Sequence, residues 1–78
     1  MRGLIKATHY YSTLQARADW AQLADYAAAN GHADDAARLA PPDSAGHRTI
    51  DKRIDALMAV LGIDVPFYVW QEQQEVTA

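Results

Sequence analysis

The side chains that could carry out catalysis or hold a metal ion are few and widely spaced in this 78-residue chain. Three histidines, His9, His32 and His47, lie far apart in the sequence, and none forms a short ligand pair such as H-x-x-x-H. The chain has no cysteine, which excludes a thiolate metal site and a disulfide. We therefore expect no metal site.

Covalent catalysis would require a nucleophile beside a base. Ser44 and His47 are three positions apart, but Ser44 is explained equally well as a turn or helix-capping residue. The adjacent carboxylates Asp34 and Asp35 lie in a stretch with no apolar pocket to raise a pKa. The glycines are isolated from one another, so the chain has no Gly-rich phosphate loop. We expect a protein that is not an enzyme and binds no cofactor.

The elements that would position a site are mainly helical. The clearest is a helix over residues 48–62, because four branched side chains recur there at spacings of four, three and four and so share one face. These side chains, called the aliphatic stripe below, are Ile50, Ile54, Leu57 and Leu61. Gly62 follows where such a helix needs a left-handed stop. The stripe must be buried against this chain or against another one.

An earlier helix is predicted over residues 13–29. Ser12 fits its N-cap, and Asn30 and Gly31 fit its end. Its alanine-rich face permits close approach by the aliphatic stripe, so the stripe can be buried without a partner. Arg17 is a charge on that apolar side, and its stem can lie along the core with the guanidinium at the rim.

A short helix is predicted between these two, over residues 33–40. Two acidic residues in its first turn suit the helix dipole, and the prolines at 41–42 stop it. Ser44 or Thr49 would then cap the helix that follows.

Both ends of the chain favour β structure. Residues 3–11 are rich in β-branched and aromatic side chains, and residues 67–70 have the same chemistry. We predict a single α+β domain over residues 1–78, mainly helical, with three helices packed on a two-stranded sheet. The N-terminal strand and a strand at 66–71 would form that sheet. A tail helix started by Pro66 gives the alternative, a small all-α bundle.

Charge and hydropathy restrict the partners. The net charge of −3 and a pI near 5.4 disfavour a general nucleic-acid binder, which needs a basic face. Residues 54–78 contain acidic side chains and no lysine or arginine, which would suit a protein partner with a basic surface. No apolar run is long enough to span a membrane and no secretory signal pattern occurs, so we expect a cytoplasmic protein.

Docking on a protein partner is the function that these features favour. In a strand, Tyr68 and Trp70 lie on the face opposite Phe67 and Val69, and a sheet covered on one face cannot bury both pairs. Exposed Trp and Tyr are frequent interface hot spots. We expect a small regulator or inhibitor of the kind that phages and plasmids also encode. The predicted contact residues are Tyr68, Trp70, Glu72, Tyr10, Tyr11, Asp19 and Asp25, although Trp70 could instead close the edge of the core.

Two alternatives stay open. A helix-turn-helix-like DNA-binding regulator would use the start of the helix at 48–62, although two aspartates on that helix and a long connection at 41–46 oppose this reading. Its contact residues would be Arg48, Thr49, Lys52 and Arg53. A homodimeric structural or adaptor module would use the aliphatic stripe as its seam, although two heptads are short for a coiled coil.

Overall fold

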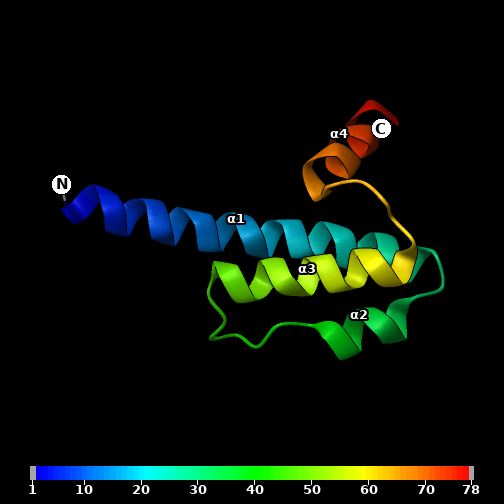
Figure 1. The fold of residues 1–78 in the computed structure, drawn as a ribbon. Helices are drawn as coiled ribbons and strands as arrows, with labels where there is room; N and C mark the ends of the chain where they lie inside the picture. The colour runs from blue at the N-terminus through cyan, green and yellow to red at the C-terminus, as the bar shows by residue number, and fades with distance from the viewer. Residues whose placement is uncertain (1, 78) are drawn as a thin grey trace.

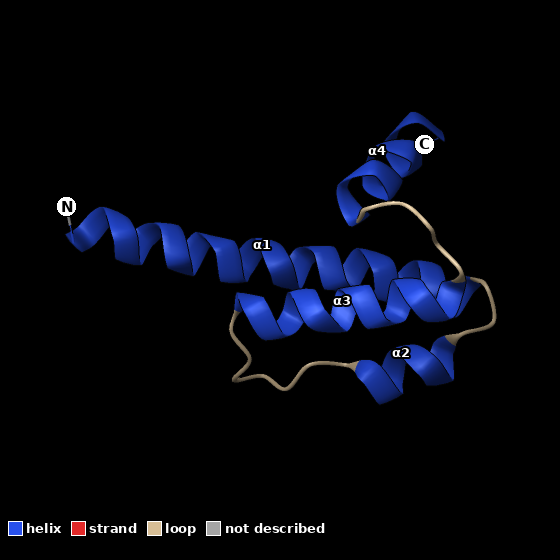
Figure 2. Cartoon of the chain, viewed as in Figure 1, coloured by secondary structure: helices blue, strands red, loops and turns tan. Residues whose placement is uncertain are grey.

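The computed structural model describes the backbone of residues 2–77 and the side chains of residues 12–75. Four helices make up the fold in the order α1 (Arg2–Ala29), α2 (Ala33–Leu39), α3 (His47–Leu61) and α4 (Phe67–Thr77). Helices α1 and α3 lie side by side, α2 packs along the same pair, and α4 lies on the opposite side from α2 (Figure 1). Residues 2–77 contain no strand (Figure 2). The predicted α+β fold with a two-stranded sheet is therefore wrong, and the fold is a small helical bundle.

Helix α1 is a single helix of 28 residues, so the strand predicted at residues 3–11 is wrong. No proline occurs in this segment, and its glycine lies at the very start. Extending an existing helix by a turn costs far less than nucleating one, and this outweighs the modest strand preference of β-branched and aromatic side chains. Ser12 consequently lies inside α1 and does not cap it.

The predicted end of α1 is confirmed. Gly31 has a φ of +85°, the left-handed conformation that glycine adopts without steric cost. The backbone N–H of His32 donates to the carbonyl of Ala27 at 2.8 Å, and the Asn30 side-chain amide donates to the carbonyl of Tyr26 at 2.8 Å. These bonds satisfy carbonyls that the last turn of a helix otherwise leaves open.

The core lies between α1 and α3. Leu23 and Ala27 of α1 are completely buried, as are Ile50 and Leu57 of α3. This arrangement confirms that the alanine-rich face of α1 receives the aliphatic stripe. The remaining stripe residues are the buried Ile54 and the half-buried Leu61. The chain itself covers the stripe, so it is not an exposed seam for a second copy.

Arg17 fixes the connection that leads into α3. Its Nη2 donates to the carbonyl oxygens of Pro42 and Ala45, at 3.3 Å each, and to that of Asp43. The N-cap of α3 is Gly46, which makes no side-chain capping bond, so the cap predicted at Ser44 or Thr49 is wrong. A tertiary contact from α1 thus holds the loop in place where a local cap was expected. The predicted stop of α3 is confirmed, because Gly62 has a φ of +73°.

Helix α4 replaces the strand predicted at residues 66–71, which is wrong. In a strand, Phe67 and Trp70 would face opposite sides, whereas a helix places positions three apart on one side. Trp70 is buried and Phe67 half-buried, while Tyr68 points to solvent. In the helix, Phe67 and Trp70 can both face the core while Tyr68 faces solvent, so the two opposed strand faces that could not both be buried do not arise. No helix in the described part of the chain is long and apolar enough to cross a membrane.

Candidate functional site

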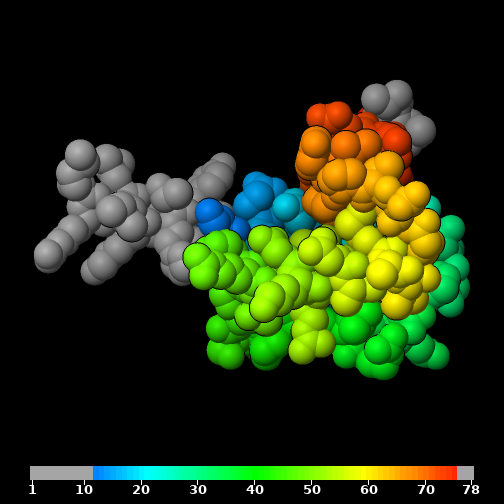
Figure 3. Space-filling model, in the orientation of Figure 1, coloured from blue at the N-terminus to red at the C-terminus, as the bar shows by residue number. Residues whose placement is uncertain are grey.

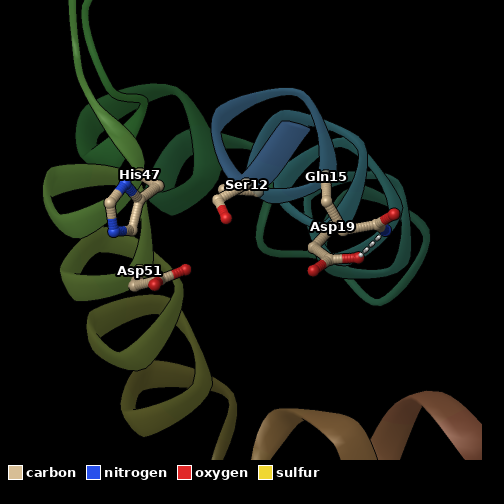
Figure 4. A pocket seen from close by; sticks show the side chains of 6 residues that line it. Ser12, Gln15, Asp19, His47 and Asp51 are labelled. Carbon is tan, nitrogen blue, oxygen red and sulfur yellow. Dashed lines mark hydrogen bonds between the residues drawn. The ribbon is translucent and has the colours of Figure 1, made fainter. Parts of the chain in front are cut away.

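An open trough of about 330 Å³, lined mainly by residues with polar side chains, lies between α1 and the start of α3. Figure 4 shows Ser12 and Asp19 on the α1 wall and His47 and Asp51 on the α3 wall, with a stretch of α4 nearby. We call this feature the α1–α3 trough, and its lining residues are Ser12, Gln15, Ala16, Asp19, His47 and Asp51. Positions 12 and 19 are two helical turns apart on α1, and positions 47 and 51 are one turn apart on α3. Each pair therefore lies on one face of its helix.

The lining of the trough is acidic. It includes the carboxylates of Asp19 and Asp51 and no lysine or arginine. Asp19 Oδ1 accepts hydrogen bonds from the side-chain amides of Gln15 on α1 and Gln71 on α4, both at 3.0 Å. Asp51 is exposed, and its carboxylate makes no hydrogen bond or ion pair with the described residues. A trough with this charge can receive a cationic group, such as an ammonium or guanidinium.

The outer face of α4 is a second candidate surface. Tyr68, Glu72 and Glu75 recur at spacings of four and three, share one side of the helix and are all exposed. Tyr68 is 66% exposed, an unusual degree for a large aromatic side chain. We call these three residues the α4 outer face, which combines an aromatic group with two negative charges.

Trp70 lies on the inner side of α4 and not at the surface. It is 3% exposed and contacts Tyr26 edge to face, with ring centroids 5.2 Å apart. Phe67 packs beside it at 5.4 Å between centroids. Of the two roles that the sequence left open for Trp70, the structure gives it the position of a core residue.

The other predicted contact residues are dispersed. Asp19 is half-buried on the wall of the trough, and Asp25 is exposed farther along α1. Tyr10 and Tyr11 belong to α1, but their side chains lie outside the described residues. Among residues 12–75, the structure therefore does not bring the predicted contact residues together into one patch.

The basic residues at the start of α3 are mostly at the surface. Arg48, Thr49 and Lys52 are exposed, and Arg53 is half-buried. A smaller hollow of about 270 Å³ adjoins this region and is lined by residues 46–49. The exposed carboxylates of Asp51 and its neighbour Asp55 lie on the same helix, so the surface is of mixed charge.

A short charged network marks the start of α2. Asp35 Oδ2 lies 3.0 Å from Nδ1 of His32, and Asp35 Oδ1 accepts from Nη2 of Arg38 at 3.0 Å. The hydrogen bond with His32, followed by the one from Arg38, lowers the pKa of the Asp35 carboxyl below its ordinary value of 3.8. Within residues 12–75, no three His, Asp or Glu side chains cluster so as to hold a metal ion.

The sequence did not point to four of the trough residues, Ser12, Gln15, His47 and Asp51. For the residues on α1, the helical spacing of positions 12, 15 and 19 indicates a shared face. That spacing is informative only if α1 is known to continue through Ser12 without a break. The pairing of α1 with the start of α3 is a tertiary contact, and no local pattern encodes it. Comparison with protein-family models, curated proteins and solved structures found no significant match.

Proposed function

We propose that the chain is a small, non-enzymatic, cytoplasmic domain that docks on a protein partner bearing basic side chains and regulates or blocks it. The observation that carries this proposal is the α4 outer face, where Tyr68 is 66% exposed and is followed along the same side of the helix by two exposed carboxylates. Tyrosine can contribute a large contact area at low entropic cost, which is why it is frequent at interface hot spots. Carboxylates around it would steer a basic partner and exclude acidic ones.

The acidic trough supports the same class of partner. Gln71 of α4 bonds to Asp19 on the trough wall, so the trough and α4 adjoin each other. A partner seated on the α4 outer face could therefore extend a lysine or arginine side chain toward Asp51. Contacts of this kind would give specificity and a fast, salt-sensitive association.

Site-specific photo-crosslinking in cell extract tests the proposal. A photoreactive amino acid at Tyr68 should give one protein adduct of defined mass that survives nuclease treatment, while the same group at the exposed Leu14 of α1 should not. Reversing the charges with Glu72→Lys and Glu75→Lys should abolish the adduct, and reversing the exposed Asp34 of α2 should not. Equal crosslinking from both positions, or an adduct indifferent to charge reversal at α4, would refute the proposed docking face.

A DNA-binding regulator is the second candidate, because Arg48, Thr49 and Lys52 are all exposed at the start of α3. Neither basic side chain makes a hydrogen bond or ion pair with the described residues, so both are available to phosphate. Fluorescence anisotropy with labelled duplex DNA tests this reading. Binding that falls steeply with added salt and is lost in Arg48→Gln/Lys52→Gln would support it, and no binding at low salt would remove it.

A further inference from the structure

Helix α4 contributes one buried side chain, Trp70, and one half-buried side chain, Phe67, to the hydrophobic core. Trp70 is its only fully buried residue in the described part of the helix, and every other buried hydrophobic residue lies between Ala16 and Met58. In the space-filling view α4 stands out as an orange and red lobe above α1 and α3 (Figure 3). Nine of the ten buried hydrophobic residues in the described chain therefore lie outside α4, in α1, α2, α3 and the connection into α3.

Gln71 makes polar contacts between α4 and α1 that water can replace. Gln71 Nε2 donates to Asp19 Oδ1 at 3.0 Å and to Gln22 Oε1 at 2.8 Å, and all three side chains are partly exposed. Nε1 of Trp70 is buried without a hydrogen-bond partner among the described residues. Docking of α4 thus strips water from an N–H group and offers it nothing in exchange, which favours release.

A hinge separates α4 from α3. The N–H of Ile63 donates to the carbonyl of Met58 at 3.0 Å, so Ile63 still belongs to the end of α3. The carbonyl of Pro66 accepts from two backbone N–H groups of the first turn of α4, so Pro66 is held to the start of α4. Asp64 and Val65 lie between them, both exposed, and their backbones make no hydrogen bond with the described residues. Rotation at these two positions breaks no backbone bond.

We propose that α4 is a latch: it releases from α1 and α3 as a unit about the Asp64–Val65 hinge, while α1, α2 and α3 stay folded. The hydrogen bonds of Gln71 hold α4 to α1 in the closed state. When the latch opens, these bonds break and the side chain of Trp70 leaves the core. Release exposes the faces of Trp70 and Tyr26 that contact each other in the closed state. The latch rests on these internal contacts and holds whether or not the α4 outer face binds a partner.

Native-state hydrogen exchange of the full chain, followed by NMR over a series of low urea concentrations, tests the latch. We expect the amides of residues 71–75 to share one opening rate, at least about ten-fold faster than the α3 amides and with a weaker dependence on urea. Gln71→Ala should raise the exchange of these amides several-fold and leave α3 unchanged. Glu72→Ala is the matched control, because Glu72 is adjacent on α4, is exposed and makes no hydrogen bond or ion pair with the described residues.

Three results would overturn the proposal. Equal exchange rates and equal urea dependence for α4 and α3 would mean that α4 leaves only when the whole domain unfolds. Rates that rise steadily toward the C-terminus would indicate fraying and not release as a unit. Acceleration by Glu72→Ala as large as that by Gln71→Ala would show that helix propensity, and not the bond to Asp19, controls the exchange.

Discussion

Replacement of Trp70 by alanine separates a latch from an integral part of the core. The indole is 3% exposed and packs edge to face on Tyr26. In a single cooperative core, such a truncation costs about 3–5 kcal/mol. If α4 releases as a unit, the loss of stability of the α1–α3 core is instead capped at the free energy of α4 docking. Once α4 is released, weakening its contacts further cannot affect the rest of the chain.

The docking free energy is expected to be smaller than the full value for a buried tryptophan. Burial of the unpaired Nε1 of Trp70 opposes docking by about 1–3 kcal/mol. Subtracting about 2 kcal/mol, the middle of that range, from about 3–5 kcal/mol leaves an upper limit of about 1–3 kcal/mol for the docking free energy. The hydrogen bonds of Gln71 do not change this range much, because each exchanges a bond to water for a bond to protein.

Urea unfolding measures how much stability the α1–α3 core loses in Trp70→Ala, and so tests this upper limit. In Trp70→Ala the remaining tryptophan, Trp20, packs against the core from α1 and reports on α1, α2 and α3 by its fluorescence. We expect a loss of about 1–3 kcal/mol together with a smaller m value, since α4 is already released before the transition. Leu23→Ala is the comparison, because Leu23 is fully buried between α1 and α3, and it should cost about 2–5 kcal/mol with m unchanged.

The reasoning would be refuted by either of two results. One is a Trp70→Ala variant that is already unfolded without urea. The other is a loss of about 3–5 kcal/mol with the m value of the unaltered chain. Both would mean that α1, α2 and α3 do not remain folded when the contact of Trp70 with Tyr26 is lost.

Three further predictions concern the loops and α2. Arg17→Met should lower the free energy of unfolding by about 1–3 kcal/mol in urea titration, because three loop carbonyls lose their donor. Gly62→Ala should cost about 1 kcal/mol because its φ is +73°, whereas Gly46→Ala, at a φ of −83°, should change the thermal midpoint little. The pKa of Asp35 is lowered in the folded chain, so its stabilisation of α2 is present above the unfolded-state pKa and is lost as pH falls through the folded-state value. NMR titration should show the start of α2 losing helical chemical shifts with Asp35 protonation, and Asp35→Asn should remove that step.

Periodicity and helix punctuation predict α2 and α3 to within one residue at each end. The stripe from Ile50 to Leu61 and the left-handed Gly62 leave little freedom in α3, because spacing and stop signal agree. The strand prediction for residues 3–11 is wrong because strand propensity reflects packing within a sheet. The described chain contains no sheet in which these residues could pack. The same propensity misplaces residues 66–71, where the proline start was the stronger signal.

The candidate site depends on information that no single segment holds. Asp19 was predicted as a contact residue from its charge, but its place on the trough wall follows from a long α1 lying against the start of α3. The sequence could not decide whether Trp70 is buried, because its side chain faces the side opposite Phe67 in a strand and the same side as Phe67 in a helix. The exposure of Tyr68, by contrast, is shared by the predicted strand and the observed helix, so that part of the prediction survives the change of fold.

The anchor made by Arg17 has a consequence for how this chain can vary in evolution. Its three acceptors are main-chain oxygens, at positions 42, 43 and 45, and every amino acid supplies such an oxygen. The side chains at these positions can therefore drift while the contact persists, whereas position 17 needs a long basic side chain whose nitrogen reaches all three oxygens. Among relatives of this chain we expect a conserved basic residue facing a loop of variable composition, and its loss wherever an insertion or deletion alters the length of that loop.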